Sequence, residues 1–219
     1  MPLDEPGPEL TLVAGLLDAR LPWTGVAPTR LAVGWSEILE AQVRGEDPTA
    51  GWRAAVGAQM TRQHGVPAPA RTPSAMVLQW CLEVPATLLT MVAVLGPWRV
   101  ALEDVSFALD PVGLFPATFG LSAVAPAPGD IPARLRAAEV EYLTAAHRLA
   151  ATYDSGVKTS SRQRTGMVDD MWAMAQDRAR RAVLPPPHPD PGPRVSCCFL
   201  FALPGMRECQ ACPRQTTRP

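Results

Sequence analysis

The sequence has almost no excess of charge and carries no signal of nucleotide binding. Its 219 residues have a formal net charge of −1 at pH 7, so no global basic field attracts nucleic acid. Neither a Gly-x-Gly-x-x-Gly turn nor a Walker sequence occurs, which excludes the common dinucleotide and nucleoside triphosphate sites. Lysine occurs once, at Lys158, against nineteen arginines. We attribute this bias to coding rather than to a functional choice of guanidinium groups.

We also expect no secretory signal, because the N-terminal Met-Pro-Leu-Asp-Glu places no basic residues before an apolar run. The most membrane-like stretch, 75–96, is interrupted by Gln79, Glu83 and Pro85. We therefore expect a buried helix, broken near Pro85, rather than a membrane span. The expected location is the cytoplasm, with a peripheral position at the inner face of the cytoplasmic membrane as the other option.

Hydrophobic residues make up 47% of the chain, enough for one well-cored domain with or without a small appendage. The periodicity of the apolar residues predicts helices over 8–20, 29–44, 48–64, 130–153 and from 160 or 161 to about 182. Alternation predicts a half-buried strand over 103–109, followed by a turn at 110–113 and a partner strand at 114–119.

These elements predict an α+β fold that is mainly helical. Residues 1–183 form the helical body, with a small sheet near 100–120. Residues 184–193, Leu-Pro-Pro-Pro-His-Pro-Asp-Pro-Gly-Pro, cannot continue a helix or a central strand, so we expect a stiff spacer. Residues 194–214 then form a separate C-terminal module.

Five cysteines in a cytosolic chain of this size favour metal or redox chemistry over structural disulfides, since that compartment keeps thiols reduced. Four of them fall within sixteen residues, as Cys197, Cys198, Cys209 and Cys212. In the spacer 199–208, alternating apolar residues and a turn near Pro204 predict a cysteine hairpin. Such a hairpin brings Cys209 opposite Cys198, so that four thiolates can meet around one inorganic centre.

The spacing leaves three chemistries open. Cys209 and Cys212 are separated by two residues, the spacing at which two sulfurs bind one metal ion in both zinc sites and iron-sulfur sites. The adjacent Cys197 and Cys198 chelate a single ion poorly in a regular strand, which disfavours a structural zinc site in a helical binding protein. A dithiol-disulfide oxidoreductase using Cys209 and Cys212 is the third reading, although no βαβ pattern surrounds the pair.

The cysteine pattern resembles the C-terminal signature of the FhuF-type ferric siderophore reductases: Cys-Cys, ten residues, Cys, two residues, Cys. The motif covers about the last tenth of the chain, and Pro213 follows it. The stretch 74–80 and the helix before the spacer are loosely similar to segments of that family, whereas 166–170 departs from its tryptophan-containing pattern. The resemblance implies a cytoplasmic iron-sulfur oxidoreductase that holds a 2Fe-2S cluster on Cys197, Cys198, Cys209 and Cys212.

The implied reaction is one-electron reduction of siderophore-bound ferric iron, which releases ferrous iron because the hard oxygen ligands bind that ion far less well. The implied partners are a ferric siderophore and an external electron donor, namely a ferredoxin, a flavin reductase or reduced flavin. No catalytic residues beyond the cluster are expected, since electron transfer needs no acid-base pair. Neither nucleic acid nor a membrane span is expected.

Arginines surround the cysteines, and they either tune the cluster potential or are solvated surface charges. They are Arg194, Arg207, Arg214 and Arg218. In the first case, replacing Arg207 and Arg214 with glutamine is expected to lower the midpoint potential.

Other candidate residues receive structural interpretations. Cys81 is expected in the core, and Glu83 is expected to face solvent beside the Pro85 break. Asp169 and Asp170 resemble a carboxylate pair, but neighbouring helix positions point in different directions. His64, His147 and His188 form no metal-ligand spacing with one another. The six tryptophans are expected mostly in the core, with one or two available to line a siderophore groove.

Overall fold

The structure is a computed structural model that describes residues 6–185, 192–209 and 211–215. Six α-helices occur in these ranges, together with two short 3₁₀ turns. The helices are α1 (Pro8–Asp18), α2 (Trp35–Val43), α3 (Ala50–His64), α4 (Arg71–Leu95), α5 (Ile131–Thr152) and α6 (Ser161–Val183). The 3₁₀ turns are η1 (Leu102–Asp104) and η2 (Leu200–Ala202).

Six short strands form two sheets in the same ranges. They are β1 (Gly25–Ala27), β2 (Val33–Gly34), β3 (Trp98–Arg99), β4 (Val105–Leu109), β5 (Pro116–Leu121) and β6 (Ala125–Pro126). The larger sheet has the order β1-β5-β4-β2, in which β1 pairs parallel to β5 and the other pairs are antiparallel. The second sheet is the antiparallel pair β3-β6.

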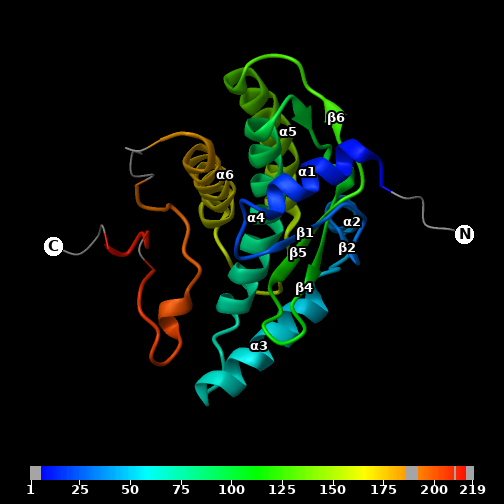
Figure 1. The fold of residues 1–219 in the computed structure, drawn as a ribbon. Helices are drawn as coiled ribbons and strands as arrows, with labels where there is room; N and C mark the ends of the chain where they lie inside the picture. The colour runs from blue at the N-terminus through cyan, green and yellow to red at the C-terminus, as the bar shows by residue number, and fades with distance from the viewer. Residues whose placement is uncertain (1–5, 186–191, 210, 216–219) are drawn as a thin grey trace, which may run out of the picture.

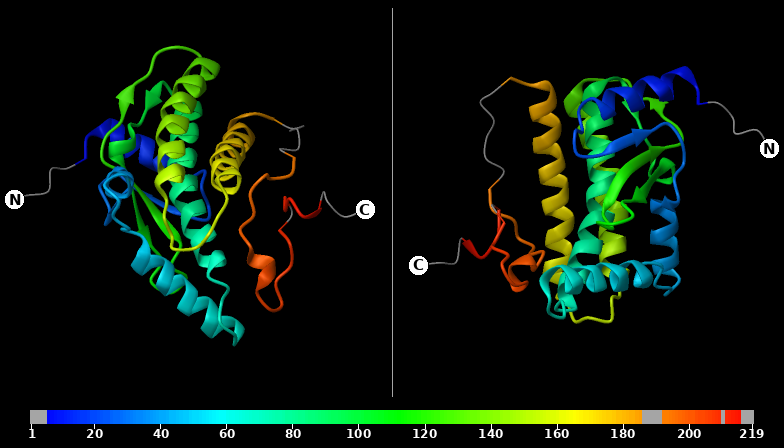
Figure 2. Two further views of the ribbon diagram at one scale, coloured as in Figure 1. Left: turned by 180° about the vertical axis from the view of Figure 1, so that it is seen from behind. Right: turned by 60° about the horizontal axis from the view of Figure 1, so that its bottom comes forward.

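Helix α4 is the centre of the arrangement (Figure 1). It lies between α6 on one side and the larger sheet on the other, and α5 packs against both α4 and α6 (Figure 2). Nearly every residue of α4 from Thr72 to Val94 is buried or half-buried. The fold is therefore mainly helical α+β, as the sequence predicts.

The predicted helices are confirmed with two corrections, the first at the start of α2 and the second at Pro85 in α4. Residues 29–34 are not helical, because they pack along the larger sheet. Val33 and Gly34 pair with β4, and the Leu31 N–H donates to the Ser106 hydroxyl at 2.9 Å. Helix α2 therefore begins only at Trp35. Helices α5 and α6 begin as expected, with Asp130 accepting from the Ala133 N–H at 2.8 Å and Ser160 from the Gln163 N–H at 3.2 Å.

The β4-β5 hairpin is confirmed, but β4 is not half-buried. Ser106 is only 1% exposed, since its hydroxyl is used inside the fold by Leu31. The turn between the strands is fixed by Asp110, whose carboxylate accepts from the Val112 N–H at 2.9 Å and also from the Gly113 N–H. Leu114 completes the turn in the left-handed region, with φ of 59°.

Helix α4 continues through Pro85, against the expectation of a break there. Proline has no N–H, so the carbonyl of Cys81, four residues earlier, loses its helical partner. The indole Nε1 of Trp35 donates to that carbonyl at 2.5 Å. Trp35 is fully buried, so α2 supplies the hydrogen bond that the helix itself cannot make.

Helix α4 is the one helix in the described ranges that is long and apolar enough to cross a membrane. Within its most apolar 18-residue window, 83% of the residues are buried inside the protein. The central helix of a soluble protein passes the same test of length and composition, so the match is weak evidence for a membrane span.

The contact between Trp35 and Cys81 predicts an energetic coupling between Trp35 and Pro85. We expect Trp35→Phe to destabilise the wild-type chain by about 1–3 kcal/mol more than it destabilises Pro85→Ala, because alanine restores the backbone donor. Urea unfolding of the four chains of this double-mutant cycle measures the difference. An equal cost of Trp35→Phe in both backgrounds would show that the indole hydrogen bond does not replace the helical one.

Candidate metal centre

The described residues of the C-terminal segment 192–215, which we call the cysteine segment, lie against α6 and the beginning of α4 (Figures 1 and 2). Residues 186–191 of the predicted spacer, together with Gln210 and Arg218, lie outside the described residues. The segment has little regular structure of its own, so its position depends on side chains that the helices provide.

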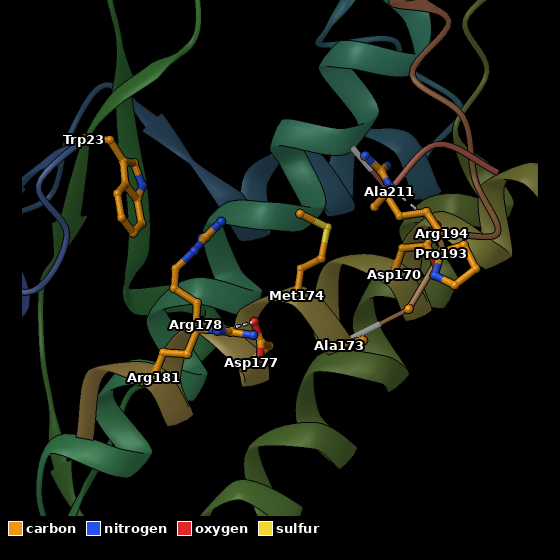
Figure 3. A pocket seen from close by; sticks show the side chains of 11 residues that line it. Trp23, Asp170, Ala173, Met174, Asp177, Arg178, Arg181, Pro193, Arg194 and Ala211 are labelled. Atoms are coloured by element: carbon orange, nitrogen blue, oxygen red, sulfur yellow. Dashed lines mark hydrogen bonds and ion pairs between the residues drawn. The ribbon is translucent and has the colours of Figure 1, made fainter. Parts of the chain in front are cut away.

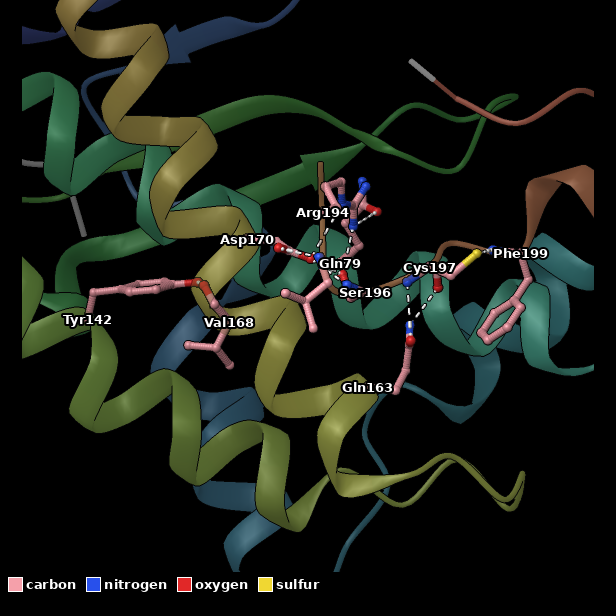
Figure 4. Close-up of polar contacts among 10 residues, drawn as sticks. Gln79, Tyr142, Gln163, Val168, Asp170, Arg194, Ser196, Cys197 and Phe199 are labelled. Atoms are coloured by element: carbon pink, nitrogen blue, oxygen red, sulfur yellow. Dashed lines mark hydrogen bonds and ion pairs between the residues drawn. The ribbon is translucent and has the colours of Figure 1, made fainter. Parts of the chain in front are cut away.

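Asp170, on α6, is the main anchor of this segment (Figure 4). Its carboxylate accepts from the Val195 N–H at 2.9 Å, from the Ser196 N–H at 2.7 Å and from the Ser196 hydroxyl at 2.5 Å. It also lies 3.7 Å from the Arg194 Nε. Asp170 is 8% exposed, whereas Asp169 is exposed and faces His147 at 3.6 Å. Asp169 and Asp170 therefore point in different directions, as expected. The sequence does not identify Asp170 as a support of the cysteine segment.

Two further positions on α6 complete the docking surface for the segment. The Gln163 side chain pairs with the backbone of Cys197, accepting from its N–H at 3.1 Å and donating to its carbonyl at 2.6 Å. At Gly166, a Cβ atom would lie 2.8 Å from the Cγ1 of Val195, so only glycine allows this approach. The part of the cysteine segment that leads up to Cys197 is therefore held on one face of α6.

The loop between the cysteine pairs is a 3₁₀ turn and not the predicted hairpin strand. Phe199 has a φ of 60°, which is incompatible with a strand, and η2 follows it. The Thr72 hydroxyl of α4 donates to the Phe199 carbonyl at 3.4 Å, and the Arg71 guanidinium lies over its ring. The predicted reversal of direction does occur, because the Met206 N–H donates to the Leu203 carbonyl at 3.1 Å around Gly205.

The four cysteines of the motif differ in exposure, and burial raises the pKa of two of them, Cys197 and Cys209. Cys198 and Cys212 are 7% and 2% exposed, Cys197 is half-buried and Cys209 is exposed. Burial raises the pKa of the Cys197 thiol to about 11, although the Phe199 N–H, which donates to its sulfur at 3.4 Å, lowers that pKa. Burial likewise raises the pKa of Cys209, while the nearby Arg194 lowers it.

The four thiols lie near one another. Those of Cys198 and Cys212 each interact with Cys197 and with Cys209, and each raises the pKa of these two groups. The Cys-x₂-Cys turn at 209–212 is closed locally, since the Cys212 N–H donates to the Cys209 carbonyl at 2.9 Å. Cys81, by contrast, is 1% exposed in α4, where burial raises its thiol pKa to about 12. It is the core residue that the sequence predicts.

A zinc site and a two-iron centre place different demands on four thiols. A tetrahedral zinc site brings its ligands to one ion, with sulfurs at about 2.3 Å, whereas a 2Fe-2S centre distributes four thiolates over two ions. Within residues 6–185, 192–209 and 211–215, no group of three or more His, Cys, Asp or Glu side chains is placed to hold one metal ion. Four cysteine sulfurs match the donor set of either centre, so the residues present are compatible with both.

The arginines near the thiols are not equivalent. The Arg194 side chain is 8% exposed and donates to the side-chain Oε1 of Gln79 at 3.0 Å and to the Ser196 hydroxyl at 3.1 Å. Arg214 is 54% exposed, lies 4.0 Å over the Phe201 ring and pairs with Glu208 at 3.5 Å. Arg194 is thus the buried cation of the site, which the sequence did not distinguish from its neighbours.

We expect Asp170→Asn to release the cysteine segment, because it leaves Arg194 buried without a carboxylate, a change that costs about 3–5 kcal/mol. Hydrogen-deuterium exchange of the backbone N–H groups of Val195, Ser196 and Cys197 measures the effect. Asp169→Asn, on the same turn but exposed, is the matched control and should leave the exchange unchanged. Equal exchange in the two variants would refute the anchoring role.

The raised pKa of Cys197 predicts slow alkylation in the metal-free chain. At pH 8 a thiol whose pKa is about 11 instead of the ordinary 9.0 contains about 100-fold less thiolate. We expect iodoacetamide to modify Cys197 about 100-fold more slowly in the folded chain than in urea. Mass spectrometry of peptides resolves the rates, and Cys81 should react more slowly still. A folded rate within a few-fold of the rate in urea would contradict this placement.

The arrangement keeps four thiols near one another on a segment that is hydrogen-bonded to α6. Of the residues that build it, the four cysteines are apparent from the sequence. Asp170, Gln163 and Gly166 are not, because the residues that they contact lie much further along the chain, at Val195, Ser196 and Cys197. Comparisons of the chain with protein-family models, with curated proteins and with solved structures give no match.

Proposed function

We propose that this protein is a 2Fe-2S ferric siderophore reductase of the cytoplasm. The observation that carries the proposal is the proximity of four thiols on a segment anchored to α6, where Cys198 and Cys212 each interact with Cys197 and with Cys209. The resemblance of the same cysteines to the FhuF-type signature adds the substrate, a siderophore-bound ferric ion. The four cysteines would be the cluster ligands.

The bound centre supplies a one-electron exchange, and the protein supplies its surroundings. Gln163 and Asp170 hold the backbone on the N-terminal side of the ligands, so the sulfurs keep their positions. The Phe199 N–H donates to the Cys197 sulfur, a contact that favours an anionic thiolate. Exposure of Cys209 leaves one edge of the site accessible to a donor or an acceptor.

Reduction of the substrate amounts to its release. Siderophore oxygen donors bind the small ferric ion strongly, and one added electron gives a ferrous ion that they hold far less well. No proton donor or nucleophile has to be aligned with the substrate, so an accessible cluster edge is sufficient. An external donor, such as a ferredoxin, a flavin reductase or reduced flavin, would return the electron.

Anaerobic reconstitution with iron and sulfide tests the cofactor. We expect two irons and two sulfides per chain, a red-brown colour and a rhombic EPR signal after reduction. Serine at any one of Cys197, Cys198, Cys209 or Cys212 should abolish or strongly alter these properties, whereas Cys81→Ala, the matched control, should retain them. A colourless protein that binds one zinc would instead favour the helical binding protein with a structural zinc site.

Stopped-flow reoxidation tests the substrate. The dithionite-reduced protein is mixed with ferric hydroxamate, catecholate and citrate complexes, and the loss of the reduced spectrum is followed with a ferrous-iron chelator present. Reoxidation by at least one siderophore complex, with matching ferrous release, is the expected result. Indifference to all of them would leave a one-electron carrier that is not a siderophore reductase.

A further inference from the structure

The body of the fold contains a cavity walled by aromatic rings. Its volume is about 350 Å³, and four aromatic side chains line it together with Glu83, Val84 and Pro116. These aromatic residues are Trp23, Trp80, Phe115 and Phe119. Two of the rings are accessible from outside, Trp23 at 52% exposure and Phe115 at 39%. Exposed rings around a cavity favour a flat aromatic ligand, which can stack on them.

A second cavity, of about 360 Å³, begins at the same Trp23 and continues along α6 (Figure 3). Arg178 and Arg181 lie in it near Trp23, and Arg194 and Ala211 of the cysteine segment lie at its other end. Because Trp23 lines both cavities, one ligand can occupy the aromatic cavity and extend past Trp23 to the arginines.

Arg178 stands at the junction of the two cavities. Its guanidinium lies 4.8 Å over the Trp23 ring and donates to Glu83 at 3.1 Å and to the Thr87 hydroxyl at 3.0 Å. Glu83 is therefore a half-buried ion-pair partner and not the solvent-facing residue that the sequence predicts. Arg181 is more exposed, at 45%, and pairs with Asp177 at 2.7 Å. Guanidinium groups at this position suit an oxyanion such as a phosphate.

The aromatic cavity is joined to the cysteine segment by a short series of contacts. Trp80 lines the cavity, and its neighbour on α4, Gln79, accepts a hydrogen bond from Arg194. The Arg194 N–H in turn donates to the Ala211 carbonyl at 3.0 Å. Ala211 precedes Cys212. A redox-active ligand in the cavity would therefore lie next to residues that contact the cluster-binding segment.

We propose that the two cavities bind reduced flavin mononucleotide, the electron donor of this protein, with its ring in the aromatic cavity and its phosphate beside Arg178 and Arg181. The inference rests on the proposed function, which requires an external donor. Flavin mononucleotide has a planar redox ring joined by a short chain to a phosphate. In the same order, the aromatic cavity is followed, past Trp23, by the guanidinium groups of Arg178 and Arg181. The aromatic cavity lies in the body of the fold and includes none of the cysteines.

The electrons balance in the transfer from reduced flavin to ferric iron. One reduced flavin carries two electrons and gives them up one at a time, releasing two protons to solvent as it becomes oxidised. The two electrons pass through the cluster in succession and reduce two ferric ions to two ferrous ions. No further oxidant or reductant is needed.

Anaerobic titration of the reconstituted full chain with flavin mononucleotide, riboflavin and lumiflavin, followed by quenching of flavin fluorescence, tests the site. We expect saturable binding of the mononucleotide and at least tenfold weaker binding of riboflavin, which lacks the phosphate. Arg181→Gln should remove most of that difference. Trp23→Ala should weaken all three flavins at least tenfold, whereas Val112→Ala, at a 76% exposed position outside both cavities, should change nothing.

Three results would overturn the proposal: no saturable binding of any flavin, the same affinity in Trp23→Ala as in the wild-type chain, or displacement of the flavin by ferric siderophore. The last result would make the cavity the acceptor site. Failure here is distinguishable from failure of the proposed function, because dithionite replaces the flavin as reductant. A protein that binds no flavin but reduces ferric siderophores after dithionite treatment retains its function and loses only this donor.

Discussion

The buried carboxylate of Asp170 is the interaction on which the arrangement of the cysteine segment depends. One side chain accepts hydrogen bonds from two consecutive backbone N–H groups and one hydroxyl, and it also faces the Arg194 cation. These partners directly precede Cys197 in the chain. Without a carboxylate there, Arg194 would be a buried cation without an anion, an arrangement that folded proteins avoid at a cost of several kcal/mol. The charge pair and the position of the first cysteine of the motif are thus one structural feature.

The sequence predicts the helices, the β4-β5 hairpin and the four cysteines because those signals are local. Apolar periodicity, the caps at Asp130 and Ser160, and the cysteine spacing are all contained within a few turns of chain. The failures involve partners that are distant in sequence. Pro85 does not break α4, because Trp35 reaches the orphaned carbonyl from another helix. Asp170 cannot be identified as an anchor by any rule that considers only its own helix.

The same distinction explains why the loop between the cysteines was mispredicted. Alternating apolar residues at Phe199, Phe201 and Leu203 are typical of a strand, but a strand needs a partner to satisfy its backbone groups. Here α4 offers side chains instead, with Thr72 bonded to the Phe199 carbonyl. The segment therefore takes the tighter 3₁₀ conformation. A short hairpin of this kind is marginal in water unless something packs on it.

The distribution of cations around the thiols has a consequence for the potential of a bound cluster. An oxidised 2Fe-2S centre with four thiolates carries a charge of about −2, and reduction adds one more negative charge. A cation stabilises the reduced form most where solvent does not screen it. Arg194 is almost fully buried and lowers the pKa of Cys209, whereas Arg214 is half-exposed and already pairs with Glu208. Of these two cations, the buried Arg194 should therefore control the potential, although Asp170 on its far side offsets part of its charge.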